Sequence, residues 1–186
     1  MIAIHDATPD RWPDVVTVMG TRGDPSRCWC QFFRIAGAGW DRATAPAMRD
    51  ALHEQVRGDV PPGVLAFRAD EPVGWCAVAP RGSYPRLGRS TVAQATHDGP
   101  GVWAVTCFVV RVGHRRKGVA SALLAGALDL AGRHGATVVE AYPVDTAARK
   151  ASSAELYHGP LSVFLDAGFA EVARPSAARA VVRRSL

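Results

Sequence analysis

Residues 102–133 read VWAVTCFVVRVGHRRKGVASALLAGALDLAGR, and this stretch decides the fold. The segment 102–110 is an apolar run of β-strand length. Beyond the basic turn 111–118, apolar residues recur at three- and four-residue spacing from Val119 to Ala131. That spacing predicts a helix that buries one face against a sheet. The stretch therefore predicts a strand, a turn and a helix in succession.

The turn 111–118 has the chemistry of a phosphate site. A helix start leaves backbone N–H groups without partners and carries the positive end of the helix dipole. Gly118 lets an anion approach the backbone without meeting a Cβ. The cations Arg115, Arg116 and Lys117 add positive charge beside it. A phosphorylated ligand is expected here.

Two common phosphate loops do not fit this turn. Gly113 and Gly118 have the spacing that opens a Walker A loop, but Val119 and Ala120 stand where its lysine and magnesium-binding hydroxyl belong. The dinucleotide fingerprint fails because no third glycine follows at the required spacing. What remains is residues 115–120, RRKGVA, a turn of the form Arg/Gln-x-x-Gly-x-Gly/Ala after a strand.

That turn resembles the pyrophosphate-binding turn of the GCN5-related N-acetyltransferase (GNAT) superfamily. Residues 137–142 (TVVEAY) resemble the family's next strand, and residues 164–169 (FLDAGF) resemble its closing aromatic-x-x-x-Gly-Phe signature. The resemblance covers residues 102–173, and element order extends it to the earlier chain. It implies a single acetyltransferase domain over residues 1–186, of the α/β (α+β) class. The expected fold is a mixed twisted β-sheet flanked by helices in the order β-α-α-β-β-β-α-β-α-β-β.

The resemblance implies an acetyl-CoA-dependent N-acyltransferase that moves an acetyl group to a primary amine by direct attack in a ternary complex. Two alternatives stay open: a non-catalytic acyl-CoA-binding or regulatory module with the same fold, and a phosphate-binding protein unrelated to coenzyme A. The strand 107–110 is expected to face the pantetheine arm and the turn to hold the pyrophosphate. The residues expected to bind the coenzyme are Cys107, Phe108, Val109, Val110, Arg115, Arg116, Lys117, Gly118, Val119, Ala120 and Ser121.

Proton transfer is where this sequence departs from the family. Phe164 occupies the position of the tyrosine that commonly protonates the departing thiolate, and Ala104 falls where some members carry a glutamate base. Tyr157 is the best substitute acid, with packing as its alternative role. Glu140 and His158 are candidate bases, although a water chain can also deprotonate a well-positioned amine.

Composition limits the other classes of function. A chain of 186 residues, 48% hydrophobic and 21% charged, suits one well-buried domain. It has no apolar run near the roughly 20 residues of a membrane span, and its start lacks signal-peptide features, so a cytoplasmic protein without membrane contact is expected. The net charge of +5 is concentrated at the phosphate turn and in the tail 174–184, without an aromatic platform. We therefore do not expect a nucleic-acid partner.

The segment 28–33, CWCQFF, is the most unusual in the chain. Its two cysteines allow three interpretations: reduced thiols in an aromatic wall, a part of the acceptor pocket, or a metal site. We expect no metal, because structural zinc sites need more ligands at characteristic spacing than this pair offers. The partner is expected to be a small-molecule or peptide amine whose identity the sequence does not give, and a homodimer is left open.

The rest of the chain supplies the remaining elements. Thr8 and Thr44 are placed as helix N-caps, and Gly58 as the end of the second helix. A β-hairpin is expected over 64–79. Residues 81–100 are expected to form a long surface loop, carrying Tyr84, Arg86, Arg89 and His97, that either covers the acceptor site or is a solvated connection. A helical region over 144–168, broken at 158–160, precedes two closing strands at 169–173 and 180–184.

Overall fold

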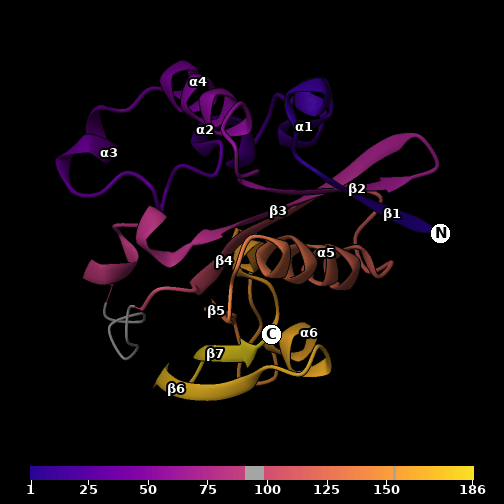
Figure 1. Ribbon diagram of the computed structural model, residues 1–186. Helices are drawn as coiled ribbons and strands as arrows, with labels where there is room; N and C mark the ends of the chain where they lie inside the picture. Colours follow the sequence, from indigo (N-terminus) through magenta and orange to yellow (C-terminus); the bar gives the residue numbers. More distant parts are fainter. Residues whose placement is uncertain (91–98, 153) are drawn as a thin grey trace.

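Seven β-strands form one sheet in the order β1-β2-β3-β4-β5-β7-β6 (Figure 1). The computed structural model describes residues 1–90, 99–152 and 154–186. The strands are β1 (Ile2–Asp6), β2 (Gly63–Arg68), β3 (Glu71–Pro80), β4 (Val102–Val110), β5 (Val138–Ala141), β6 (Ala170–Ser176) and β7 (Arg179–Ser185). The helices are η1 (Pro9–Arg11), α1 (Trp12–Met19), α2 (Pro25–Cys28), α3 (Ala38–Arg42), α4 (Ala45–Val56), η2 (Arg81–Ser83), η3 (Leu87–Arg89), α5 (Val119–Arg133), η4 (Leu156–His158) and α6 (Leu161–Asp166).

The sheet is mixed. All neighbouring strands are antiparallel except β4 and β5, which are parallel because α5 carries the chain back along the sheet between them. Both α5 and β4 occupy the residues that the hydrophobic pattern predicts. The expected α+β fold with a mixed sheet flanked by helices is confirmed.

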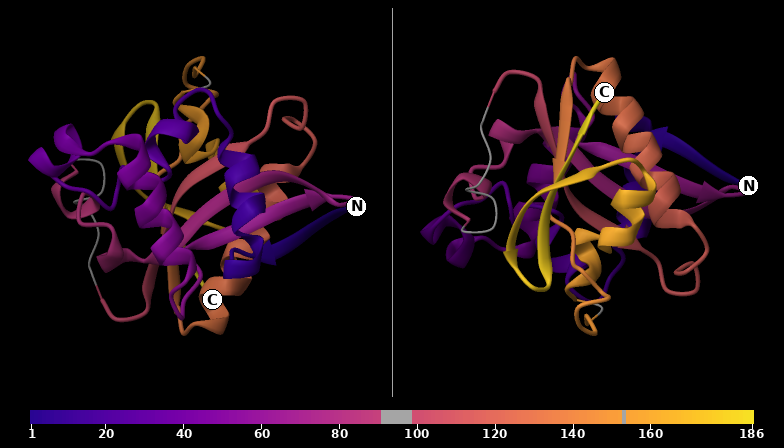
Figure 2. Two further views of the ribbon diagram at one scale, coloured as in Figure 1. Left: turned by 90° about the horizontal axis from the view of Figure 1, so that it is seen from above. Right: turned by 90° about the horizontal axis from the view of Figure 1, so that it is seen from below.

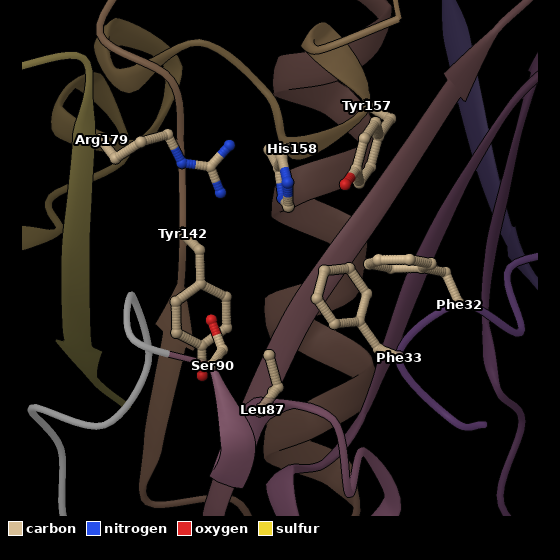
Figure 3. A pocket seen from close by; sticks show the side chains of 8 residues that line it. All are labelled: Phe32, Phe33, Leu87, Ser90, Tyr142, Tyr157, His158 and Arg179. Carbon is tan, nitrogen blue, oxygen red and sulfur yellow. The ribbon is translucent and has the colours of Figure 1, made fainter. Parts of the chain in front are cut away.

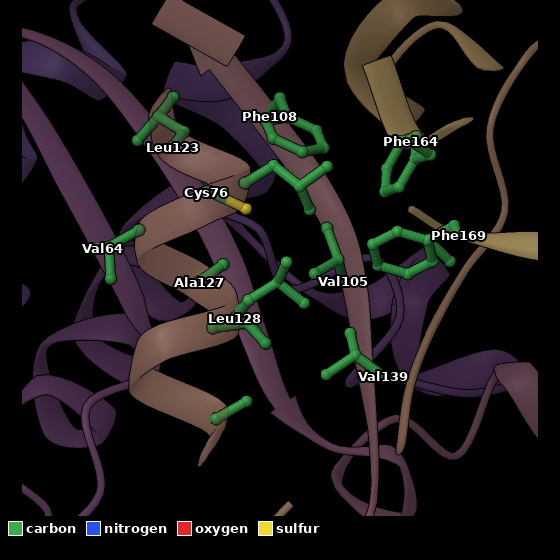
Figure 4. Close-up of a cluster of buried hydrophobic side chains, with 14 of the residues drawn as sticks. Val64, Cys76, Val105, Phe108, Leu123, Ala127, Leu128, Val139, Phe164 and Phe169 are labelled. Carbon is green, nitrogen blue, oxygen red and sulfur yellow. The ribbon is translucent and has the colours of Figure 1, made fainter. Parts of the chain in front are cut away.

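Helices cover both faces of the sheet (Figures 1 and 2). On one face lie α1, α2 and α4, and on the other lie α5 and α6. The core under α5 is the larger one, and Figure 4 shows Leu123, Ala127 and Leu128 of that helix packed against residues of β2, β3, β4 and β5. Burial of these side chains stabilises the fold by roughly 25 cal/mol per Å² of apolar surface.

Two glycines let α5 lie close to the sheet. A Cβ on Gly126 would meet Cγ2 of Ile4 at 2.3 Å, and a Cβ on Gly74 would meet Cγ1 of Val119 at 2.9 Å. Real side chains do not approach so closely, so larger residues would push the helix away from β1 and β3. The start of α5 is thereby fixed relative to β3 and its neighbour β4.

An irregularity in β4 opens the middle of the sheet. Ala77 pairs with Cys107 and Val78 with Val105, so Thr106 is an extra residue and forms a β-bulge. Pairing of β4 with β5 ends at Val105 and Ala141, although β4 continues to Val110. The second edge of β4 beyond the bulge therefore has no strand beside it.

The structure corrects three predictions. Residues 81–90 are not a surface loop, because they form η2 and η3 and bury Tyr84 and Leu87; His97 lies outside the described residues. In the region predicted as helical over 144–168, helix is confined to η4 and α6. Thr8 precedes η1 without a side-chain cap, whereas Thr44 accepts the N–H of Ala47 as predicted.

The second predicted helix ends where it was expected to end. Arg57 is the C-cap of α4, and Gly58 follows it without a positive φ. The predicted hairpin and the two closing strands are present as β2–β3 and β6–β7. In the part of the chain that the structure describes, no helix combines the length and apolar character needed to cross a bilayer.

Candidate active site

The turn before α5 presents backbone N–H groups to solvent. Gly113, Arg116 and Gly118 have positive φ angles of 91°, 57° and 76°, which fold the chain tightly ahead of the helix. No side chain caps the helix N-terminus. A Cβ on Gly118 would meet no atom within 4 Å, so the space above this backbone is open to a ligand. These features fit an anion at the positive end of a helix of 15 residues.

Two cations hold the turn in shape. Nε of Arg115 donates to the carbonyl of Val110 at 3.2 Å, and Nζ of Lys117 donates to the carbonyl of Gly113 at 2.7 Å. Both side chains stay exposed, so their remaining donors can reach a bound phosphate. The turn is thus preorganised and positively charged, as the residues predicted to bind pyrophosphate require.

The free edge of β4 leads from this turn into the molecule. Phe108 points into the core under α5, whereas Cys107 and Val109 point to the opposite face, in the core with α1 and α4. Beyond the bulge, the backbone groups on this edge have no β5 partner. An extended ligand arm can therefore pair with this edge, as a strand would.

A cavity of about 120 Å³ lies on the face to which Cys107 points. Figure 3 shows its lining, which comes from segments far apart in the sequence. A second hollow of about 410 Å³ adjoins it and shares Phe32, Phe33 and Ser90. The residues that line the first cavity are Phe32, Phe33, Leu87, Ser90, Tyr142, Tyr157, His158 and Arg179.

The segment after Cys28 is fixed in an unusual backbone conformation. Trp29 and Cys30 both have positive φ, at 45° and 54°, which costs non-glycine residues about 1–2 kcal/mol each. Gln31 holds the bend, since its side-chain amide exchanges hydrogen bonds of 3.1 and 2.9 Å with the amide of Gln55 on α4. The bend directs the next two aromatic side chains into the cavity wall.

The cysteines of this segment are thiols inside that wall. All four cysteines of the chain are free, and Cys30 is buried where its thiol meets the thiol of Cys107. This contact, followed by burial, raises the pKa of Cys30 well above its usual value. Within the described ranges, no three His, Cys, Asp or Glu side chains gather as metal ligands.

Tyr157 and His158 face the cavity from η4, which packs on β4. Their ring centroids are 4.0 Å apart, and the ring of Phe33 lies 5.7 Å from that of His158. Burial, and secondarily the charge of Arg179, lowers the pKa of His158 well below its usual value, so its imidazole is neutral at pH 7. Burial raises the pKa of Tyr157 to about 12, so its hydroxyl stays protonated.

Glu140, the other predicted base, lies in a separate buried cluster. Its Oε1 accepts from Nε of Arg81 at 3.1 Å and from the hydroxyl of Tyr142, and its Oε2 accepts from Nε of Arg183 at 2.7 Å. Both carboxylate oxygens are therefore engaged, and the side chain is fully buried. The structure brings Tyr157 and His158 together but does not bring Glu140 to them.

The two residues that depart from the family pattern, Phe164 and Ala104, are buried in the core. Phe164 is fully buried between Phe108 and Phe169, with ring centroids 5.9 and 5.3 Å away, and Ala104 is also fully buried. Neither side chain carries a transferable proton. Side chains that donate or accept a proton must therefore be sought among those that line the cavity.

Sequence reasoning missed half of the cavity. Arg179 was counted only as part of a basic tail, and Tyr142 only as the end of a strand. A signal existed for Phe32 and Phe33, because they follow the unusual cysteine pair. No local pattern marks Arg179, since tertiary structure alone places it beside His158.

Comparison with known families agrees with this geometry. The sequence model of the Acetyltransferase (GNAT) family matches residues 28–158, which is more than half of the chain. The chain belongs to the GNAT acetyltransferase family. That match includes the segment after Cys28, the bulged strand, the α5 turn and η4, so the GNAT assignment reaches further toward the N-terminus than the residues that first suggested it.

Solved GNAT structures share the fold. The GNAT domain of S. lividans PAT is 19% identical, with a TM-score of 0.58 over 98% of this chain and 89% of that one. A GCN5-related N-acetyltransferase from Kribbella flavida is 19% identical, with a TM-score of 0.57 over 100% and 98%. The PaiA N-acetyltransferase from Thermoplasma acidophilum, solved in complex with coenzyme A, is 10% identical, with a TM-score of 0.54 over 100% and 99%. The comparison with curated proteins gave no match.

Proposed function

We propose that this GNAT protein is an acetyl-CoA-dependent N-acetyltransferase that transfers the acetyl group directly to a primary amine in a ternary complex. One observation carries the proposal: the edge of β4 that β5 leaves unpaired lies between the open turn at Gly118 and η4, whose Tyr157 and His158 line the cavity. The coenzyme A complex of the related PaiA enzyme supports the donor. The donor therefore reaches β4 from the α5 side and the acceptor from the opposite face.

The turn residues bind and orient the donor. Backbone N–H groups at the start of α5, with Arg115 and Lys117, hold the pyrophosphate, and the free edge of β4 aligns the pantetheine arm beside Cys107. Bound acetyl-CoA supplies an activated thioester carbonyl. The aromatic walls exclude water from the place where the amine arrives.

His158 and Tyr157 handle the protons. The neutral imidazole of His158 accepts one proton from the amine as the new N–C bond forms. Tyr157, whose hydroxyl is protonated at neutral pH, donates toward the sulfur as the C–S bond breaks. His158 then releases its extra proton to solvent, and Tyr157 takes up a proton from solvent.

A two-part experiment tests this function. Release of free thiol from acetyl-CoA is measured across a panel of primary amines, and the melting temperature is measured with and without coenzyme A, because a ligand that binds the native state raises it. We expect amine-dependent thiol release and a higher melting temperature. Stabilisation by coenzyme A without transfer to any amine would instead favour a non-catalytic acyl-CoA-binding module.

A further inference from the structure

Within residues 1–90, 99–152 and 154–186, Arg179 has no carboxylate paired with it. It opens β7 and lines the cavity, and Figure 3 shows its guanidinium directed toward His158 above the ring of Tyr142. Its Nε is buried and makes no hydrogen bond, and among the described residues the guanidinium forms no ion pair. Arginine carries five donors in a planar fork, so the cavity contains unused hydrogen-bonding capacity.

Two other arginines of β6 and β7 are paired with acids. Arg183 binds Glu140, and Arg174 binds Glu171 at 2.6 Å and Asp145 at 2.9 Å. The acid that acts on Arg179 from outside the cavity is Glu155, whose carboxylate already accepts from Arg149, Ser152 N–H and Ser152 Oγ. Arg179 therefore differs from Arg174 and Arg183, whose charges are paired with carboxylates.

Keeping this guanidinium unpaired is costly. Burial lowers the pKa of Arg179, which means that the site disfavours the charged form it contains. A buried charge is tolerated when it meets a partner of opposite charge with good geometry. A carboxylate supplies that partner, because its two oxygens match the guanidinium fork.

The backbone fixes Arg179 close to the proposed base. Val144 pairs with Arg179 on one side and with Pro160, two residues after His158, on the other. Its N–H donates to the carbonyl of Gly159 at 3.0 Å, and the N–H of Asp145 donates to the carbonyl of Ala178 at 2.9 Å. The start of β7 and the end of η4 are thus held against one residue, which places the cation and the imidazole side by side.

The remaining walls are mostly apolar. Phe32, Phe33 and Leu87 face the cation and the imidazole across the cavity (Figure 3). The cavity of about 120 Å³ has room for the polar end of an acceptor beside the cation and the imidazole, and the adjoining hollow of about 410 Å³ has room for the rest of it. Its occupant therefore combines an anionic group and an amine at one end with an apolar body at the other.

We propose that the acceptor is a free α-amino acid with an apolar side chain and that Arg179 binds its carboxylate; this inference rests on the proposed function. The α-amino group then lies next to His158, and the side chain packs on Phe32 and Phe33. Polyamines are disfavoured by charge repulsion from Arg179. Peptide N-termini are disfavoured because they carry no carboxylate beside the amine.

Matched amines test the inference. L-phenylalanine, L-leucine, their decarboxylated amines and their uncharged amides are compared by thiol release at saturating acetyl-CoA. Loss of a charge-assisted, desolvated contact predicts kcat/KM about 100-fold lower for the amines and amides than for the amino acids. The amino group of an amide is less basic than that of the amino acid, so a larger fraction of it is unprotonated at neutral pH. If the carboxylate were irrelevant, the amides should therefore react faster than the amino acids.

Three variants assign the effect to Arg179. Arg179→Met is expected to remove the preference for amino acids while coenzyme A affinity is unchanged, and Arg179→Lys to restore part of it through charge without the fork. Arg174→Met, which removes an exposed and already paired arginine from the neighbouring strand, is expected to keep the preference. Arg179→Met should also melt at an equal or higher temperature, since it removes a half-buried charge that has no paired carboxylate among the described residues.

The outcomes separate the two proposals. Thiol release with neutral amines or amides at a kcat/KM equal to or above that of the amino acids overturns the role of Arg179 and leaves the acetyltransferase intact. A preference for amino acids that survives in Arg179→Met overturns it as well. Coenzyme A binding without transfer to any amine overturns the proposed function itself.

Discussion

The proposed coenzyme turn and the proposed acceptor cavity are built in opposite ways. The turn is one continuous stretch, residues 115–121, whose cations are exposed to solvent. The cavity is assembled from five separate segments between Phe32 and Arg179, and its ionisable groups are buried or half-buried. Charge at the turn is screened by water and salt, whereas charge in the cavity is screened much less. Coenzyme binding should therefore depend on backbone shape, and acceptor chemistry on single side chains.

The largest effect is expected at the turn. Gly118→Glu places bulk and negative charge where the pyrophosphate should lie, so coenzyme A affinity should fall by about 1000-fold, or ~4 kcal/mol. Gly135→Glu is the matched control, because Gly135 is exposed, has a φ of 82° and lies at the other end of α5. Calorimetric titration should show normal affinity in the control. Equal affinity in the two variants would remove the turn from the coenzyme site.

Next in size is the effect of removing the proposed base. His158→Ala should lower kcat by about 100- to 1000-fold, within the usual range for a general base, and leave coenzyme A affinity unchanged. His134→Ala, at the exposed end of α5, is the control. The measurement is pre-steady-state thiol release. A loss that appears only in KM would mean that His158 binds the acceptor without taking its proton.

A smaller loss of kcat is expected when the hydroxyl of Tyr157 is removed. Tyr157→Phe should lower kcat by roughly tenfold to a hundredfold while the fold and coenzyme A affinity stay the same. The ring contacts with Phe33 and His158 are retained in this variant, so packing is preserved. Unchanged kcat, under conditions where chemistry limits turnover, would reduce Tyr157 to a wall of the cavity.

Acid should destabilise the cavity through His158. Its pKa is lowered in the folded state, so the unfolded chain binds a proton more readily. This contribution to stability is complete above the unfolded pKa of about 6.5 and declines as pH falls below it, by at most ~1.4 kcal/mol per pH unit. Urea unfolding between pH 7 and pH 5 should therefore show a weaker pH dependence in His158→Leu than in the wild type. Identical slopes would contradict the burial of a neutral imidazole.

The smallest effect is expected at Cys107. Direct transfer needs no acyl-enzyme, and the thiol of Cys107 is buried against another thiol rather than beside an activating base. Cys107→Ser should keep kcat within about threefold, far less than the loss of a covalent nucleophile would cause. Mass spectrometry after incubation with acetyl-CoA alone should find no acetylated Cys107. A stoichiometric acetyl group on that residue would replace direct attack with a two-step route.

The same contrast explains what the sequence could predict. The strand, turn and helix of 102–133 were predictable because hydrophobic period and turn chemistry are local properties. The bulge at Thr106 was not, because only pairing with β3 reveals the extra residue. Residues 81–90 were mistaken for a surface loop, because few apolar residues marked them and Tyr84 and Leu87 are buried only by distant segments.

The predicted catalytic residues also show the difference between local sequence properties and long-range contacts. Tyr157 and His158, predicted as acid and base, both line the cavity from η4. Their chemical roles stay predictions. Glu140 has a suitable carboxylate, but sequence could not show that Arg81, 59 positions earlier, and Arg183, 43 positions later, both bind it. Contacts between residues so far apart in the chain produce no periodic pattern in the sequence.

The place of β7 in the sheet has a consequence for how the protein is made. The strand lies between β5 and β6, yet it follows both of them in the chain. It carries Arg179 into the cavity and Arg183 to Glu140. During synthesis, the coenzyme turn and all of α5 leave the ribosome before β7 does. A nascent chain can thus form the proposed donor site first, and the residue proposed to select the acceptor arrives only when β7 inserts.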